Sequence, residues 1–157
     1  MLFRSPMNKA KPFTLQNQND ETVSLDDYKG KYVVLYFYPK DNTPGCTVEA
    51  KDFSCLKEEF AQLNCAIIGV SKDSIAKHQN FIAKQELTID LLSDPENEII
   101  ESYGAWQLKK NYGKEYMGIV RSTYLIAPDG NILQEWTKVR VKGHVAAVLK
   151  AVKEAQA

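Results

Sequence analysis

Cys46 carries the clearest chemical signal in this sequence, because it stands where a cysteine can become a nucleophile. The segment 39–45 before it leads from an apolar run typical of a buried strand into a stretch with helical spacing. The first turn of a helix has unpaired backbone N–H groups and the positive end of the helix dipole, and both stabilise a thiolate. The competing interpretation is that Cys46 is a small buried hydrophobe, the commonest fate of a free cysteine.

Two polar residues could take part in chemistry at this cysteine. Thr43 precedes the expected helix, where it could cap the first turn or direct its hydroxyl at a ligand. Arg121 stands at the start of a later strand, where a lone arginine is ordinarily a surface ion-pair partner. The residue types alone leave both interpretations open for each of them.

The other two cysteines, Cys55 and Cys65, do not indicate a disulfide framework. Successive cysteines are nine and ten residues apart, so no Cys-x-x-Cys pair suggests a structural zinc site or a thioredoxin-type dithiol. An odd number of cysteines, in a chain with no export signal, predicts a reducing compartment. We therefore expect a cytoplasmic protein.

Both histidines, His78 and His144, are isolated in the sequence, and neither has a spaced partner that suggests a metal site. We expect His144 to be a surface or capping residue before the last helix. A cysteine hydrolase would need a histidine base, but neither histidine lies in a segment expected near Cys46. No glycine-rich phosphate loop occurs either, so the sequence predicts neither a metal nor a cofactor.

The composition is that of an ordinary globular domain. The 157 residues are 44% apolar and 25% charged, and the 20 basic residues balance the 20 acidic ones. A net charge of zero argues against nucleic-acid binding, and no apolar run approaches the ~20 residues that span a membrane. We expect one domain over residues 1–157. Residues 1–7 lack the apolar core of a secretory signal and could be disordered, an alternative start or a non-native extension.

Hydrophobic periodicity and turn residues predict alternating strands and helices. The expected strands are 13–15, 22–24, 32–38, 66–70, 89–92, 122–127 and 132–137. The expected helices are 46–63, 74–85, 94–104 and 145–155, and 106–118 is expected to be a polar, aromatic-bearing loop. Basic residues at 109–110 and 138–142 are expected to form a solvated edge.

This order of elements predicts an α/β fold with a mixed central sheet and helices on both faces. A thioredoxin-like three-layer sandwich satisfies it. Periodicity alone would also allow a flavodoxin-like sheet, but the hairpin expected late in the chain, around residues 128–130, makes that alternative weaker.

Two motifs resemble one known family. The pattern Pro-x-x-x-Thr-x-x-Cys at 39–46 matches the active-site signature of the peroxiredoxins. The longer string YFYPKDNTPGCTVEA at 36–50 and the string GIVRST at 118–123 resemble the bacterioferritin comigratory protein subfamily. The order of strands and helices agrees from about Phe13 to the C-terminus, so the resemblance covers nearly the whole chain.

The resemblance implies a role for each residue of the motifs. Cys46 would be the peroxidatic cysteine, which a peroxide oxidises to a sulfenic acid. Thr43 would hydrogen-bond the peroxide, and Arg121 would stabilise both the thiolate and the leaving oxygen. Glu49, three residues after the cysteine, would lie along the same helix and orient the arginine. Pro39 would wall the pocket and shield the sulfur from solvent.

The activity implied is that of an antioxidant thiol peroxidase acting on hydrogen peroxide and organic hydroperoxides. Its partners would be the peroxide and a reductant, either thioredoxin or a small thiol, and relatives are monomers or homodimers. The alternative from another class is a non-enzymatic peroxide sensor that uses the same cysteine.

The sequence departs from the subfamily at the resolving cysteine, which many members carry five residues after the peroxidatic one. Lys51 occupies that position. Cys55 lies nine residues along the expected helix from Cys46, so a disulfide between them would require the helix to unwind. Cys65, the other candidate for a resolving cysteine, precedes a buried strand and is expected in the core. A one-cysteine cycle, in which an outside thiol reduces Cys46, is the slightly favoured alternative.

Overall fold

The computed structural model describes residues 9–157. The expectation for residues 1–7 lies outside this range. Among the described residues, no helix is long and apolar enough to cross a membrane.

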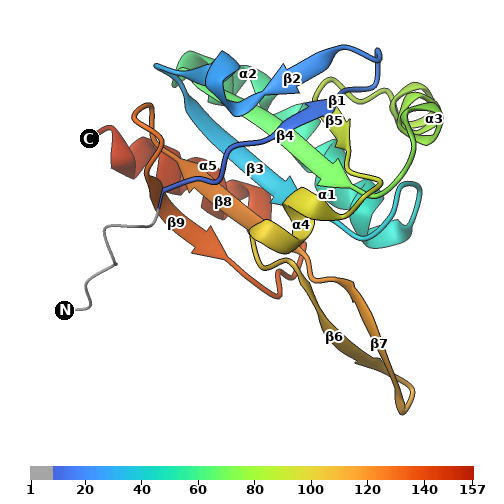
Figure 1. The fold of residues 1–157 in the computed structure, drawn as a ribbon. Helices are drawn as coiled ribbons and strands as arrows, with labels where there is room; N and C mark the ends of the chain where they lie inside the picture. The colour runs from blue at the N-terminus through green and yellow to red at the C-terminus, as the bar shows by residue number, and fades with distance from the viewer. Residues whose placement is uncertain (1–8) are drawn as a thin grey trace.

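Seven strands form one mixed sheet at the centre of the fold (Figure 1). They are β1 (Thr14–Gln16), β2 (Thr22–Ser24), β3 (Tyr32–Phe37), β4 (Cys65–Ser71), β5 (Asp90–Ser93), β8 (Ser122–Ile126) and β9 (Ile132–Trp136). Their spatial order is β2-β1-β5-β4-β3-β8-β9. The three central strands β3, β4 and β5 run parallel, whereas β8 pairs with β3 in the antiparallel direction.

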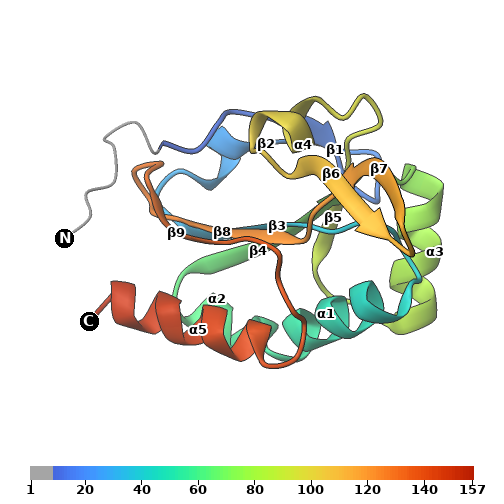
Figure 2. The same ribbon diagram turned by 90° about the horizontal axis from the view of Figure 1, so that it is seen from below.

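Helices lie on both faces of this sheet, as Figure 2 shows edge-on. Their bounds are η1 (Leu25–Tyr28), α1 (Pro44–Cys55), α2 (Lys57–Gln62), α3 (Ile75–Gln85), α4 (Glu98–Ser102) and α5 (His144–Ala155). One apolar cluster joins α1, α2, α3 and α5 to one face, and a second joins α4 and the first strands to the other. The predicted thioredoxin-like sandwich is therefore confirmed.

The central strand β3 shows why its sequence specifies a buried position. Its alternate side chains serve opposite clusters: Val34 and Tyr36 face α1 and α5, while Leu35 and Phe37 face the other layer. The ring of Tyr36 lies against Gly69 of β4, where a Cβ would come within 2.8 Å of the ring. Glycine at that position therefore lets a large side chain cross the neighbouring strand.

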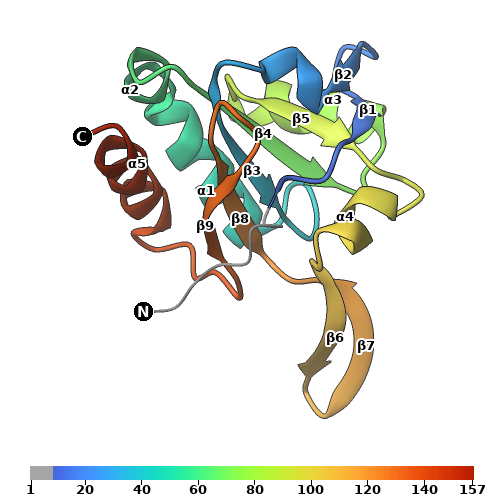
Figure 3. The same ribbon diagram turned by 60° about the vertical axis from the view of Figure 1, so that its left-hand side comes forward.

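The loop predicted at 106–118 is wrong, because these residues form a two-stranded hairpin. Strands β6 (Trp106–Asn111) and β7 (Lys114–Ile119) pair in register and project from the body of the fold (Figures 1 and 3). The turn between them, Tyr112-Gly113, has positive φ at both residues, as a tight hairpin requires. The strand pattern is weak in the sequence because most of the hairpin's side chains are at least partly exposed.

Two helix predictions need correction. The helix expected at 46–63 is divided at Leu56 into α1 and α2, with φ −99° and ψ 7° at that residue. The helix expected from 94 begins only at Glu98. Asp94 caps it from outside, because its carboxylate accepts the N–H groups of Ile99 and Ile100 at 3.0 and 2.9 Å. Proline 95 therefore lies in the preceding turn and not in the helix.

Candidate active site

The antiparallel pairing of β3 and β8 brings the two peroxiredoxin-like motifs together at one end of these strands. Phe37, the last residue of β3, lies opposite Ser122, the first residue of β8. The active-site loop, residues 38–43, leaves the sheet at this point and enters α1. Arg121 directly precedes β8, so it stands beside the start of that helix.

Cys46 is the third residue of α1 and is 2% exposed. Arg121 donates one guanidinium N–H, from Nη2, to its Sγ at 3.4 Å. The other terminal nitrogen, Nη1, donates to Glu49 Oε1 at 2.6 Å. A Cβ on Gly45 would lie only 3.1 Å from Nη2, so glycine there gives the guanidinium room to approach the sulfur. The structure thus brings together three residues that the sequence singled out.

Thr43 occupies the N-cap position of α1 with extended backbone angles. Its side chain makes no capping hydrogen bond; the hydroxyl donates instead to the carbonyl of Lys40 at 2.8 Å. Pro44 follows at the first helical position, where its missing N–H costs nothing. Since a hydroxyl has one donor, the Thr43 oxygen is free to accept a hydrogen bond from a ligand while it donates to Lys40.

Arg121 and Glu49 form an ion pair in which the glutamate is the fully buried partner. Glu49 is 0% exposed, and its second oxygen, Oε2, has no hydrogen-bond partner among the described residues. Burial raises the pKa of Glu49 to about 7, although Arg121 works to lower it. Burial also opposes the charge of Arg121, but Glu49 and Cys46 outweigh it and raise the pKa of the guanidinium. A carboxyl that titrates near neutral pH therefore supports the arginine.

A pocket of about 470 Å³ opens over Arg121. It is lined by Pro39, Gln107, Leu108, Lys109, Lys110, Val120, Arg121, Lys138 and Val139. Pro39 is one of the lining residues, whereas Cys46 and Thr43 are not among them. A different pocket, of about 330 Å³, lies near the N-terminal end of β3, far from Cys46, and neither a cysteine nor an arginine lines it.

Lys109 is a pocket residue that sequence reasoning missed, having assigned it to a solvated edge. It is half-buried, and its Nζ donates to the carbonyl of Ile119 at 2.9 Å. Burial lowers the pKa of Lys109, Arg121 lowers it further, and Cys46 opposes them. The hairpin β6–β7, which was not foreseen, is what brings this lysine toward the cysteine.

The other cysteines lie apart from this site. Cys65, buried at the start of β4, pairs with Tyr32, and burial raises its pKa to about 12. Its expected place in the core is confirmed. Cys65 lies beside the first residue of β3, whereas Cys46 lies beyond the last. Each residue of a strand adds about 3.3 Å, so roughly the whole length of β3 separates the two cysteines. Cys55 is exposed at the last residue of α1, nine residues or about 13.5 Å of helix beyond Cys46.

The surface position expected for His144 is wrong. It is buried as the first residue of α5, between the rings of Phe53 and Trp136, with its Nε2 2.8 Å from the hydroxyl of Thr123. Burial and the charge of Arg121 lower its pKa to about 4. The histidine is therefore a neutral core residue at physiological pH.

His78 is likewise not isolated in space. It is 0% exposed, and its ring nitrogens contact Asp41 of the active-site loop and the backbone of β5. Within residues 9–157, no three His, Cys, Asp or Glu side chains gather into a group that could hold a metal ion.

A sandwich of this kind, with a cysteine at a helix start beneath an arginine, defines a class of thiol-dependent redox enzymes. The model of the AhpC/TSA family matches residues 6–135. Peroxiredoxin Bcp of Bacillus subtilis is 55% identical over 146 residues, 93% of each protein. The chain belongs to the AhpC/TSA family and, within it, to the peroxiredoxins of the bacterioferritin comigratory protein type.

Solved structures agree with this assignment. The bacterioferritin comigratory protein of Xanthomonas campestris, studied for its alkyl peroxide reduction activity, matches with a TM-score of 0.87 and 41% identity over 91% of each chain. A PrxQ variant of Xylella fastidiosa gives a TM-score of 0.90 and 36% identity over 98% of this chain and all of that one. The chain is therefore a thiol peroxidase with a redox-active cysteine, and the non-enzymatic sensor is not favoured.

Proposed function

We propose that Cys46 is the peroxidatic cysteine of this peroxidase. The observation that carries the proposal is the guanidinium of Arg121, which joins Cys46 Sγ at 3.4 Å to Glu49 at 2.6 Å. A fixed cation in contact with the sulfur stabilises a thiolate and faces the charge that develops on a leaving oxygen.

In the first step the Cys46 thiolate attacks one oxygen of a peroxide ROOH. The O–O bond breaks, the RO⁻ that leaves takes a proton to become ROH, and the sulfur becomes the sulfenic acid Cys46–SOH. Arg121 stabilises the leaving oxygen. The Thr43 oxygen accepts a hydrogen bond from the peroxide, and the free N–H groups of the first turn of α1 donate to it. Pro39 keeps water from the sulfur.

The proposed substrates are hydrogen peroxide and organic hydroperoxides. The Xanthomonas relative, which reduces alkyl peroxides, supports the second class. So does the pocket over Arg121, because the apolar side chains of Leu108, Val120 and Val139 line it beside the cations. An alkyl group can lie along these walls while the peroxide meets Arg121, whose guanidinium contacts the sulfur.

For the reductive half of the cycle we propose a one-cysteine route. A reductant thiol attacks the sulfenic acid of Cys46, giving a mixed disulfide and water. A second thiol then releases Cys46 as a thiol and leaves as a disulfide. Lys51 at the usual resolving position supports this route, as does the intact α1 helix between Cys46 and Cys55. Thioredoxin and small thiols such as glutathione are the candidate reductants, in a reducing cytoplasm.

Peroxide consumption with thioredoxin and its reductase, compared with glutathione, tests these proposals. Cys46→Ser should abolish turnover, whereas Cys55→Ser and Cys65→Ser should retain it. Turnover by Cys46→Ser would refute the assignment of the nucleophile. Mass spectrometry after a single equivalent of peroxide tests the route: an internal Cys46–Cys55 disulfide, seen as the loss of two hydrogen atoms, would overturn the one-cysteine cycle.

A further inference from the structure

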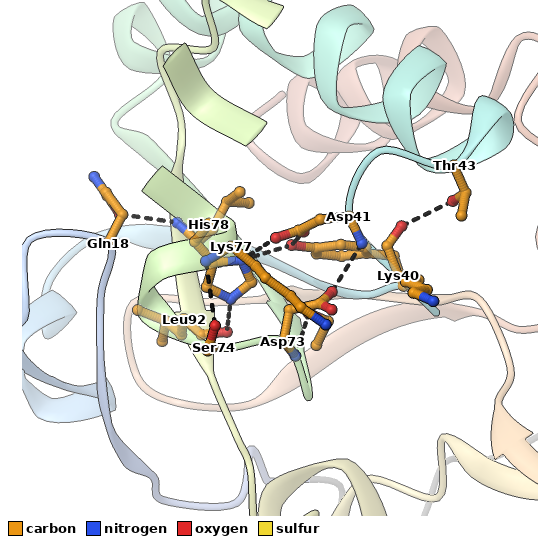
Figure 4. Close-up of polar contacts among 12 residues, drawn as sticks. Gln18, Lys40, Asp41, Thr43, Asp73, Ser74, Lys77, His78 and Leu92 are labelled. Carbon is orange, nitrogen blue, oxygen red and sulfur yellow. Dashed lines mark hydrogen bonds and ion pairs between the residues drawn. The ribbon is translucent and has the colours of Figure 1, made fainter. Parts of the chain in front are cut away.

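A cluster of buried polar side chains lies directly behind the active-site loop (Figure 4). It joins Tyr38 and Asp41 of the loop to Asp73, which follows β4, and to His78 of α3. All four are buried. None of them belongs to the peroxide-binding residues proposed above, yet the loop that carries Thr43 and leads to Cys46 is anchored on them.

The hydrogen bonds of His78 define where the protons lie. Its Nε2 is 3.0 Å from the carbonyl of Leu92, and since a carbonyl only accepts, this nitrogen carries a hydrogen. Its Nδ1 is 2.7 Å from Asp41 Oδ2, a contact that requires one proton between the two atoms. Asp41 Oδ1 accepts the hydroxyl of Tyr38 at 2.6 Å. Both ring nitrogens and both carboxyl oxygens are therefore satisfied.

The backbone of Asp41 is held as well. Its N–H donates to Asp73 Oδ2 at 2.8 Å, and the same oxygen accepts the hydroxyl of Ser71 at 2.9 Å. Asp41 is thus fixed through main chain and side chain together. The next residue, Asn42, has φ 61°, so the chain turns sharply between the anchored residue and Thr43.

We propose that Asp41 and His78 are positioning residues of the peroxidase: their buried pair fixes the active-site loop so that Cys46 stays in contact with Arg121. This inference rests on the proposed role of Cys46. The contact between Nη2 and Sγ is 3.4 Å, and a displacement of about 1 Å in an active site can reduce the rate about 100-fold. Loss of the anchor therefore slows oxidation of the cysteine.

The pair offers a variant that separates its hydrogen bonds from its charge. In Asp41→Asn the amide oxygen can still accept from Tyr38, and the amide N–H can donate to Nδ1 of a neutral His78 whose Nε2–H still meets Leu92. In Asp41→Ala and His78→Phe the connection is broken and a buried partner is left unpaired. His78→Gln keeps a donor for Asp41 but loses the second contact.

The decisive measurement is the rate constant of Cys46 oxidation by hydrogen peroxide in a single turnover, at a pH where the thiolate absorbance is at its maximum. No reductant is needed. Asp41→Ala and His78→Phe should lose about 10- to 100-fold, Asp41→Asn should stay within about threefold of the wild type, and His78→Gln should lie between. Because the rate is read on the thiolate of folded protein, a change in stability alone would leave it unaltered.

Tyr103→Phe is the matched control, since the Tyr103 hydroxyl makes a partly buried hydrogen bond to the carbonyl of Lys11 in the other layer. It should lower the melting temperature without changing the rate. A wild-type rate in folded His78→Phe would overturn the proposal. If His78→Phe fails to fold, wild-type rates in both His78→Gln and Asp41→Asn would overturn it. An equal rate loss in Tyr103→Phe would overturn it too. If instead wild-type Cys46 is not oxidised, the proposed function fails and not the anchor.

Discussion

Replacing Arg121 by leucine should slow Cys46 oxidation far more than any change in thiolate content explains. An ordinary cysteine of pKa ~8.5 is a few per cent ionised at neutral pH, so complete ionisation gains at most roughly 30-fold. Loss of one preorganised donor to a developing oxyanion ordinarily costs about 10²- to 10³-fold, or about 2.7–4 kcal/mol. Arg121 touches the sulfur and is oriented by Glu49, so we expect the 10²- to 10³-fold loss of a preorganised donor and not only the 30-fold effect of ionisation.

The assay is stopped-flow oxidation of Arg121→Leu across a pH range, with the ultraviolet absorbance of the thiolate recorded alongside. We expect the loss of about 100-fold or more to persist on the high-pH plateau, where every molecule is a thiolate. Arg140→Leu removes an exposed arginine outside the pocket lining and should react as the wild type does. A plateau rate for Arg121→Leu equal to that of the wild type would refute the reasoning.

Stability supplies an independent check on the same substitution. Arg121→Leu leaves Glu49 buried without a partner, and breaking a buried ion pair in this way costs about 3–5 kcal/mol. Adding Glu49→Gln removes the orphaned charge. The double variant should therefore recover much of the free energy of unfolding and none of the oxidation rate.

Three further predictions concern neighbours of the site. The pKa of Glu49 is about 7, so the carboxylate that orients Arg121 is protonated as pH drops through neutrality, and the oxidation rate should fall with it. Glu49→Gln should lose this limb of the pH–rate profile. An unchanged profile would contradict the prediction. Gly45→Ala should slow oxidation about tenfold, because its methyl group would lie 3.1 Å from Nη2 of Arg121; saturation kinetics would show no such loss if the guanidinium moves freely. In His144→Asn, the free energy of unfolding should fall by roughly 3 kcal/mol as pH rises from about 4.5 to 7, a fall that urea titrations should not detect in the wild type.

The sign of the last prediction follows from two opposite shifts. The pKa of Glu49 is raised, so its contribution is complete below 4.5 and lost as pH rises through about 7. The pKa of His144 is lowered, so its contribution is complete above 6.5 and lost as pH falls through about 4. Between about pH 4.5 and 6.5 the two contributions to the free energy of unfolding offset each other. Without the histidine, the pH dependence of Glu49 alone remains.

Local patterns were enough to predict most of the fold. The apolar run of β3 is continuous because both of its faces are buried, and the helical spacing after Cys46 is regular because one face of α1 packs on the sheet. A hairpin exposed on both sides has no such pattern, so β6 and β7 could not be recognised. Their turn is also unusual, since Tyr112 takes a positive φ that favours glycine or asparagine.

The active site divides in the same way. Glu49 follows Cys46 by three residues, so their proximity is a local property of a helix. Arg121 is 75 residues from Cys46, and only the resemblance to peroxiredoxins predicted that they meet. The buried positions of His78 and His144 depend on contacts between distant segments. A single sequence contains no periodic signal for such contacts. His144 was therefore wrongly expected at the surface, and the contacts of His78 were not predicted.

The pairing of β3 with β8 makes the catalytic geometry a question of strand register. A slip of one residue along β8 would turn Arg121 to the opposite face of the sheet, and a slip of two would carry it about 7 Å along the strand. The irregularity in the sheet lies where this does no harm: it falls between Leu125 and Ile126, in the pairing of β8 with β9, while the ladder to β3 runs unbroken from Val33 to Phe37. Insertions and deletions should accordingly be tolerated in β9, which pairs with one side of β8, and excluded from β3, which pairs with the other.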